Sequence, residues 1–445
     1  MNNNDVLNIM EYLTGESLPD KDKLDVTITR SILISFAHLT IGIGIIALST
    51  YIPAELKLLQ WSESSIAYLV GVATLFELSR LVIGYYGDSG LLTYKNFFGL
   101  GLLISVIGLV VIAHTIGGLI VIFGMILFTI GSAILSTIID AYLIANSRIR
   151  NKSRIAAVTQ FFRLTGFAVG GVLGIVLYQD LPFTSFFYVI AGIHFIASFI
   201  TFILLQEVHK PIKEKVMEEQ VNYKELFHAL RDKAVIGMTL FLILYPIGLF
   251  AQDAILEPFA LGVLQFEKSG VGRMAAIWGT ATLIFIPLAI VVEKKIGRII
   301  TIFIGLTLAS IALLMLAFLG LKQPVTATEI KSGQNILYMM LFLFGSGLGL
   351  MTTPGTAMMF DICAHNKALT TSLIAYFGVI VTVSRASAAF LSGIVLELTG
   401  NNFSLLFTLE AIILFSALFP LLYVNKLFKT IGIEVQKDIP LALSD

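Results

Sequence analysis

The sequence is poor in cysteine and in charge, and each shortage excludes a class of protein. Cys363 is the single cysteine among 445 residues, which leaves no disulfide framework and no cysteine-based metal site. Charged residues make up 13% of the chain, against about 25% in a soluble domain. The formal net charge is zero, so the overall charge gives no reason to expect a nucleic-acid partner.

Motifs for catalysis are lacking as well. The chain contains no Walker-type phosphate loop and no group of His and Cys residues with the spacing of metal ligands. We therefore expect neither an enzyme nor an ATP-driven pump, and neither a bound metal nor a cofactor. The first 30 residues are polar and lack the apolar core of a signal peptide, so residues 1–30 are interpreted as a cytoplasmic N-terminal leader.

Apolar sequence, in contrast, is abundant. Hydrophobic residues make up 57% of the chain, and the mean hydropathy is +0.91. A helix that crosses a bilayer needs about 20 mostly apolar residues, and this rule predicts a membrane protein with twelve spans. The predicted spans are 31–53, 64–84, 96–115, 117–145, 155–178, 183–206, 234–260, 271–292, 299–320, 334–360, 368–397 and 402–424.

The longest polar stretch after the leader, 207–233, divides the spans into two sets and is interpreted as a cytoplasmic linker. It predicts two six-helix bundles, 31–206 and 234–424, followed by a cytoplasmic tail, 425–445. Lys and Arg in short loops mark the cytoplasmic side of a membrane protein. With both termini inside, 21 of the 29 Lys and Arg residues lie in inside segments and four in outside loops. We therefore expect both termini to be cytoplasmic, in the plasma (inner) membrane.

The two halves resemble each other faintly. The offset is 205 residues around the prolines and grows to about 222 by the eleventh span. The matched pairs include Pro53 with Pro258, Gln60 with Gln265, Asp140 with Asp361, and Arg163 with Arg385. Repeated halves of this kind are typical of secondary transporters. The sequence thus predicts an all-α polytopic membrane protein with two pseudo-symmetric bundles.

Two loops at repeat-equivalent positions carry a small residue followed four residues later by an acid. The first holds Gly84 and Asp88, and the second holds Ala289, Glu293, Gly297 and Arg298. The pattern resembles the loop signature of the major facilitator superfamily, although the first copy lacks the usual basic residue after the acid. The resemblance implies a secondary carrier that works by alternating access, in which these residues control gating and do not bind the substrate.

Two further runs resemble the PucC-like branch of that superfamily. They are Gln252–Phe259 followed by Gly262, and Leu78–Asp88. The resemblance implies an alternative function, a non-transport assembly factor for light-harvesting complexes that handles chlorophyll or bacteriochlorophyll. A tetrapyrrole ligand belongs to this alternative only. Adjacent pigment-synthesis or antenna genes would favour assembly, and their absence from the genome would exclude it.

Six ionisable residues of the spans form a predicted network on the cytoplasmic side: Glu77, Arg80, Asp140, Arg163, Asp361 and Arg385. Charges inside a membrane usually face a bundle interior or a cavity and pair there. We expect Arg163 to lie within salt-bridge reach of Asp140 or Glu77, and the repeat predicts a matching pair of Asp361 with Arg385. These pairs either fix helix packing or take part in substrate or proton binding.

Asp253 and Glu257 are the candidate substrate or coupling residues. Their spacing of four predicts that they share one face of a helix in the seventh span. Two acids there suit proton coupling or a cationic or metal-bearing ligand. In the alternative, Arg273 neutralises both and the trio only joins the seventh span to the eighth. His38 is a further candidate, because Gly42 and another glycine after it permit a bend near the centre of the first span.

A small-residue face in the fifth span is expected to pack against another helix. It consists of Gly166, Gly170 and Gly174, at four-residue spacing. The partners expected for the whole protein are the lipid bilayer and a small-molecule substrate, with no nucleic acid. The protein is expected to be a monomer or a weak oligomer.

Overall fold

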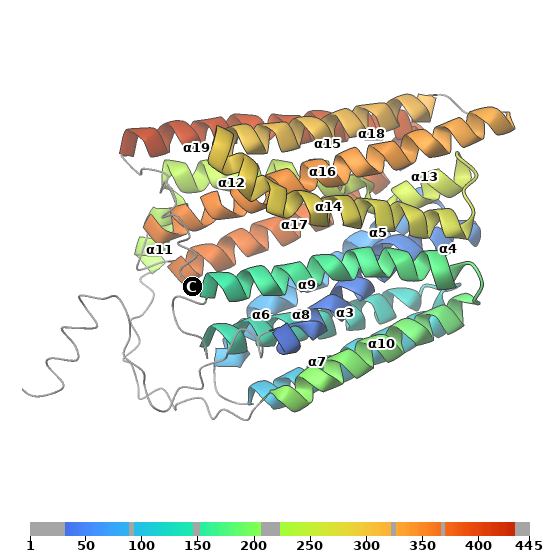
Figure 1. Ribbon diagram of the computed structural model, residues 1–445, viewed down its shortest axis with the longest axis horizontal. Helices are drawn as coiled ribbons and strands as arrows, with labels where there is room; N and C mark the ends of the chain where they lie inside the picture. The colour runs from blue at the N-terminus through green and yellow to red at the C-terminus, as the bar shows by residue number, and fades with distance from the viewer. Residues whose placement is uncertain are drawn as a thin grey trace, which may run out of the picture.

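A computed structural model describes residues 32–88, 93–145, 152–205, 223–321, 326–365 and 370–431. The leader, most of the linker and the end of the tail lie outside these ranges. Every regular element in the described residues is a helix, and twelve helical segments are long and apolar enough to cross a membrane. The predicted fold class is therefore confirmed. Figure 1 shows the helices running side by side along the long axis of the molecule.

The first six spans contain eleven regular elements. In chain order they are α3 (Phe36–Ile46), η1 (Ala47–Tyr51), α4 (Ile52–Leu58), α5 (Glu63–Leu75), η2 (Phe76–Leu78), α6 (Ser79–Asp88), α7 (Tyr94–Thr115), α8 (Val121–Ala145), α9 (Lys152–Leu173) with η4 (Gly174–Tyr178), and α10 (Phe183–Leu204). They form the lower, blue-to-green part of Figure 1.

A short helix, α11 (Tyr223–Leu230), lies in the linker and precedes the second set of spans. That set consists of α12 (Lys233–Phe250), η5 (Ala251–Ala254), α13 (Leu256–Gly262), α14 (Lys268–Ile296), α15 (Arg298–Leu321), α16 (Ala327–His365), α17 (Thr370–Thr399), α18 (Phe403–Ser416) and α19 (Leu418–Ile431). The predicted boundaries agree within a few residues for most spans. The clearest difference is α16, which is longer at both ends than the predicted 334–360.

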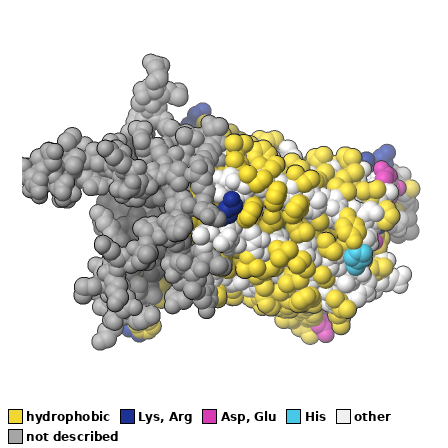
Figure 2. All heavy atoms as spheres, turned by 90° about the horizontal axis from the view of Figure 1, so that it is seen from below, with side chains coloured by type: hydrophobic (Ala, Val, Ile, Leu, Met, Phe, Trp, Pro, Cys, Tyr) yellow, Lys and Arg dark blue, Asp and Glu magenta, His cyan; other side chains and the backbone are white. Residues whose placement is uncertain are grey.

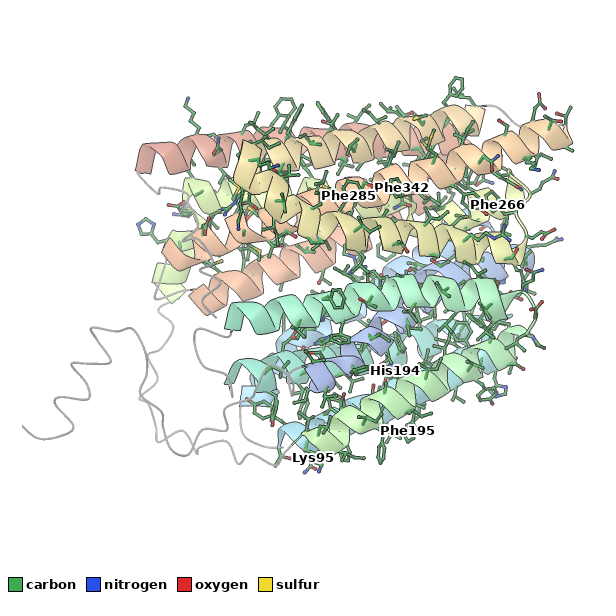
Figure 3. All side chains as sticks on the ribbon, in the orientation of Figure 1. Lys95, His194, Phe195, Phe266, Phe285 and Phe342 are labelled. Atoms are coloured by element: carbon green, nitrogen blue, oxygen red, sulfur yellow. The ribbon has the colours of Figure 1, made fainter. Side chains whose placement is uncertain are left out.

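The outer surface of the bundle is apolar, as contact with lipid requires. Figure 2 shows hydrophobic side chains over much of the visible described surface, with charged side chains mainly toward its ends. Neighbouring residues of α10 illustrate the division. His194 is buried and bonds to Ser105 on α7, whereas Phe195 is exposed on the outside (Figure 3). Such a large apolar surface is suited to contact with a membrane and not with water.

Span one and span seven are both interrupted four residues before a proline. Proline cannot donate a backbone hydrogen bond, and its ring clashes with the carbonyl of the fourth residue before it. For Pro53 that residue is Ser49, inside the π-helical turn η1. For Pro258 it is Ala254, inside the 3₁₀ turn η5. The matched prolines therefore produce a matched irregularity in each half.

This break corrects one prediction. Asp253 and Glu257 do not share one continuous helix, because Asp253 lies in η5 and Glu257 in the first turn of α13. The N–H of Ile255 bonds to the Gln252 carbonyl, which frees the carbonyl of Ala251. The hydroxyl of Ser392, on α17, donates to that carbonyl at 2.6 Å and so stabilises the break from outside the helix.

The two halves meet mainly through α9 against α14 and α5 against α17. Glycines bring the backbones close: a Cβ on Gly171 would lie 2.3 Å from the backbone N of Ala276 in the other half. Gly166 packs in the same way within the first half, where its Cβ would lie 2.1 Å from the carbonyl oxygen of Leu39. The prediction that the glycine face of the fifth span packs against helices is thus confirmed.

The bundle has two distinguishable ends. One end, called the linker end here, carries α11 and the last residues of α8, α14 and α16, and it lies at the left of Figure 1. At the opposite end, α4 contacts α13. There Lys268 pairs with Glu55 at 2.8 Å, and the hydroxyl of Tyr68 donates to Glu397 at 2.6 Å. Both contacts join the first half to the second.

Candidate functional site

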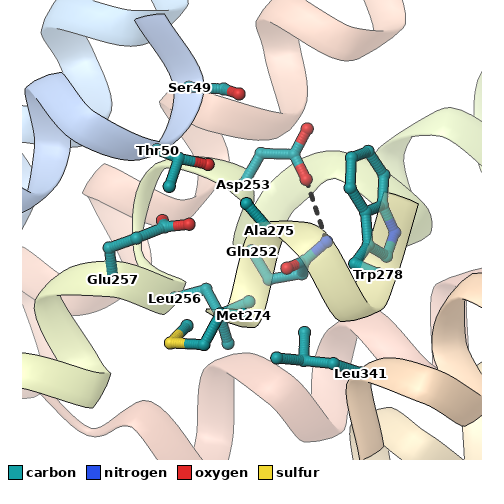
Figure 4. Close-up of a pocket in the computed structure, with 10 residues that line it drawn as sticks. All are labelled: Ser49, Thr50, Gln252, Asp253, Leu256, Glu257, Met274, Ala275, Trp278 and Leu341. Carbon is teal, nitrogen blue, oxygen red and sulfur yellow. Dashed lines mark hydrogen bonds between the residues drawn. The ribbon is translucent and has the colours of Figure 1, made fainter. Parts of the chain in front are cut away.

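A cavity lies at the break of span seven, between the two halves. Ser49 and Thr50 of η1 line it from the first half, and Asp253 and Glu257 line it from the second. Figure 4 shows these side chains with the rest of the wall. The other lining residues are Gln252, Leu256, Met274, Ala275, Trp278 and Leu341. The cavity thus combines a few polar groups with an apolar wall, as small-molecule sites do.

The two acids of this cavity differ in their contacts. The amide Nε2 of Gln252 donates to Asp253 at 2.9 Å and to the Leu249 carbonyl at 3.0 Å. Glu257 is buried and hydrogen-bonds Thr50 across the interface between the halves. Its Oε2 has no hydrogen-bond partner among the described residues. One carboxyl oxygen is therefore available to a ligand at the point where the halves meet.

A second cavity adjoins the first at Ser49, which lines both. It is lined largely by spans one, two and four, and its charged residues are Glu77, Arg80 and Arg385. Thr74, Thr129 and Ser132 add hydroxyl groups to its wall. Both cavities therefore have largely apolar walls with a few ionisable groups, two carboxyls in the first and one carboxyl with two guanidinium groups in the second.

Arg385 has a different partner from the predicted one. Its Nη1 lies 3.5 Å from Glu77, an acid of the other half, and its guanidinium lies 4.8 Å from the ring centre of Phe250. The predicted pair of Arg385 with Asp361 is wrong, because Asp361 binds Arg298. Glu77 lies in the 3₁₀ turn η2, which interrupts span two where it faces the second half.

His38 lies in the charge network of the first half and not beside Asp253. Its Nε2 is 3.1 Å from Asp140, and Arg163 lies 3.4 Å from its Nδ1. The tautomer that satisfies both contacts donates from Nε2 to Asp140 and accepts from Arg163 at Nδ1. Arg163 also lies 3.9 Å from Asp140, which is the predicted pairing. The Asp140 side chain is 41% exposed, so this network opens toward water.

The second loop motif forms a compact ion cluster. Arg298 contacts Glu293 at 2.7 Å and also pairs with Asp361 on α16. Gly297, between the two helices, has φ of 89°, a value that L side chains rarely adopt. Ala289 is fully buried on α14. In the first copy, α6 contains Gly84 and ends at Asp88, and the side chains of both lie outside the described set.

Arg273 does not neutralise Asp253 and Glu257. It is exposed on α14 and hydrogen-bonds Tyr338, and it does not line either cavity described above. The alternative in which Arg273 pairs with both acids and joins the seventh span to the eighth is therefore wrong. The helical register explains the difference, since the α14 residues that line the first cavity are Met274, Ala275 and Trp278.

Glu410 is a site residue that the sequence reasoning missed. It lies on α18, is 1% exposed, and is close enough to Asp253 for the two charges to interact. The available signal was its position as the single acid of the predicted last span, 402–424. An ionisable residue inside a membrane span is a functional candidate by default, and the same rule should have included it.

A helical bundle of two related halves, with ionisable groups in a cavity between them, is the arrangement typical of secondary transporters. The sequence profile described as Major Facilitator Superfamily matches residues 34–371, and the chain belongs to that superfamily. It is a multi-pass membrane transporter and not an enzyme.

Solved structures show the same fold. The nucleoside transporter NupG is similar with 13% identity and a TM-score of 0.65, over 90% of this chain and 100% of that one. A D-xylose–proton symporter has 15% identity and a TM-score of 0.66, over 88% and 96%. A POT family transporter in complex with a thioalcohol-conjugated peptide has 13% identity and a TM-score of 0.69, over 90% and 96%. No curated protein matches the chain, and none of these findings points to the PucC-like branch.

Proposed function

We propose that this secondary transporter carries a small polar solute through the two adjoining cavities by alternating access. The main support for the proposal is that Ser49, at the irregular turn of span one, lines both cavities. The contacts of Glu55 with Lys268 and of Tyr68 with Glu397 hold the opposite end together in this conformation. When that end opens, both contacts separate and the cavities face the other side.

The charges of the cavities suggest the chemistry of the solute. Arg80 and Arg385 supply guanidinium groups in one cavity, and Asp253 and Glu257 supply carboxyls in the other. A solute with several hydrogen-bonding groups suits this lining better than an apolar one. The similar structures are a nucleoside transporter, a D-xylose–proton symporter and a transporter in complex with a thioalcohol-conjugated peptide, so the fold itself does not select the solute.

Binding of chlorophyll or bacteriochlorophyll by an assembly factor is the second candidate, and it finds less support. Five charged residues line the two cavities, which is costly beside an apolar macrocycle. No histidine that could bind a central metal lines either cavity among the residues that the structure describes.

The orientation belongs to the proposal as well. The linker end is assigned to the cytoplasm of the plasma (inner) membrane from the excess of Lys and Arg in its loops. The solute then meets cytoplasmic water at the linker end and external water at the opposite end.

Labelling of Ser49→Cys tests alternating access without knowledge of the solute. Cys363, the single native cysteine, is first replaced with alanine. A membrane-impermeant maleimide should then label Ser49→Cys both from outside intact cells and from the other side, in inverted vesicles. The reason is that a carrier exposes its central cavity to each side in turn.

The matched control is Leu103→Cys on α7, whose side chain is 58% exposed on the bundle surface. It faces lipid, so the reagent should reach it from neither side. Labelling of Ser49→Cys from one side only, under every condition, would argue for a protein that does not transport.

The double change Asp253→Asn and Glu257→Gln tests the coupling acids. We expect a folded protein whose solute uptake no longer responds to a pH gradient, because neither amide can bind or release a proton. The measurement is uptake into proteoliposomes of a solute found by thermal-shift screening. Unchanged pH-driven uptake by the folded variant would remove both acids from the coupling mechanism.

A further inference from the structure

A carboxyl group without hydrogen bonds lies in the interior of the second half. Glu410 is 1% exposed, and neither of its carboxyl oxygens has a hydrogen-bond partner among the described residues. Its helix, α18, packs mainly against α12 and α15 and also contacts α17, α19 and η5. An ionised carboxylate in such a place is strongly disfavoured, whereas the neutral acid is tolerated. The buried position of Glu410 therefore favours the neutral form of its carboxyl group.

Of the ionisable groups on the surrounding elements, one interacts electrostatically with Glu410. The basic groups on those elements are Lys233 at the start of α12, Arg298 at the start of α15, Arg385 on α17, and Lys426 and Lys429 on α19. The acids and tyrosines are Glu397 and Tyr376 on α17, Tyr245 on α12, Tyr423 on α19, and Asp253 in η5. Among the described residues, Asp253 is the charged group that acts on Glu410. Because both groups are acids, ionisation of one disfavours ionisation of the other.

The corresponding place in the first half holds an apolar side chain. The sixth and twelfth spans align at an offset of 220 residues, with Phe183 on Phe403 and Phe187 on Phe407. Glu410 then corresponds to Ile190, which is also 1% exposed. The fold accepts an aliphatic residue at this position, so packing alone does not require the carboxyl group.

The helix that carries Glu410 packs closely against α12 just before the break of span seven. A Cβ on Gly248, near the end of α12, would lie 2.4 Å from the backbone N of Leu414. Leu414 is one helical turn after Glu410, so α12 and α18 are in backbone contact just before η5 begins. A change in charge at Glu410 therefore acts on the segment that positions Asp253.

We propose that Glu410, together with Asp253, forms a proton-binding site that controls the bend of span seven. The pair binds one proton from water in the interface cavity through Asp253, which lines it, and releases that proton when the two acids are exposed to the other side. One proton is gained or lost and no other bond changes. This inference extends the carrier function proposed above and rests on it for its physiological role.

Infrared difference spectroscopy of the purified protein at acidic and alkaline pH tests the site directly. A protonated carboxyl group gives a carbonyl stretching band that a carboxylate lacks. We expect Glu410→Gln to lose one such band and Asp253→Asn to shift it, since the two acids interact. Glu267→Gln, at an exposed position before α14, is the matched control and should leave the band unchanged.

Glu410→Ile serves if the glutamine variant does not fold, because it reproduces Ile190 of the first half. A band that persists unaltered in a folded Glu410 variant would overturn the proposal. So would a band that Asp253→Asn does not shift. Both results are independent of transport, whereas one-sided labelling of Ser49→Cys would overturn the carrier function and leave the proton site standing.

Discussion

Replacing Gly166 with alanine should destabilise the protein by about 2–3 kcal/mol, the upper part of the range for overpacked cores. The added Cβ would lie 2.1 Å from the carbonyl oxygen of Leu39 and 2.9 Å from the Cα of Gly42. Both are backbone atoms of α3, so relief requires the helices to move apart. We expect a clear loss of thermal stability in detergent, measured as a lower unfolding temperature.

The matched control is Gly192→Ala on α10, where a Cβ meets nothing within 4 Å. Alanine favours a helix over glycine by up to about 1 kcal/mol, so this variant should be at least as stable as the wild type. Equal unfolding temperatures for the two variants would show that α3 and α9 do not pack as closely as described.

Replacing Arg298 with alanine should cost about 2–3 kcal/mol and impair the gating of the second half. The change leaves Glu293 and Asp361 together without a cation, and a buried charge that loses its partner is strongly unfavourable. The expected loss is placed below the usual range for buried pairs because Asp361 is 38% exposed and water compensates in part. Unfolding in mixed micelles measures the difference in free energy.

A triple variant separates charge from packing. Adding Glu293→Gln and Asp361→Asn to Arg298→Ala removes the uncompensated charges, and we expect it to recover more than half of the lost stability. Lys295→Ala, at an exposed position on the same helix, is the control and should have almost no effect. Additive losses in the triple variant would mean that the three residues do not act as a cluster.

The architecture could be predicted because its causes are local in sequence. Each span is a run of apolar residues long enough for a bilayer, and the rule that detects it needs no information about neighbours. Pro53 and Pro258 also act locally, because each disturbs the helical turn just before it. The irregular turns η1 and η5 could therefore be expected from the sequence. The close packing of Gly166 was predicted from spacing for the same reason.

The partners of the buried charges were decided by tertiary structure. Arg385 contacts Glu77, which lies 308 positions earlier in the chain, and His38 contacts Asp140 across the first half. The repeat predicted that each half would pair its own charges alike. Among the described residues of the second half, Arg298 pairs with Asp361 and no histidine network like that of His38 occurs, so Arg385 contacts the other half.

The sequence by itself determined that this chain crosses the membrane twelve times in two related halves, because apolar length and repeated prolines are properties of short segments. Only the tertiary structure decided that Asp253, Glu257 and Glu410 gather near the break of span seven and that Arg273 does not join them. Helix rotation and the breaks within spans determine which side chains face the same cavity. Both depend on contacts between residues far apart in the chain.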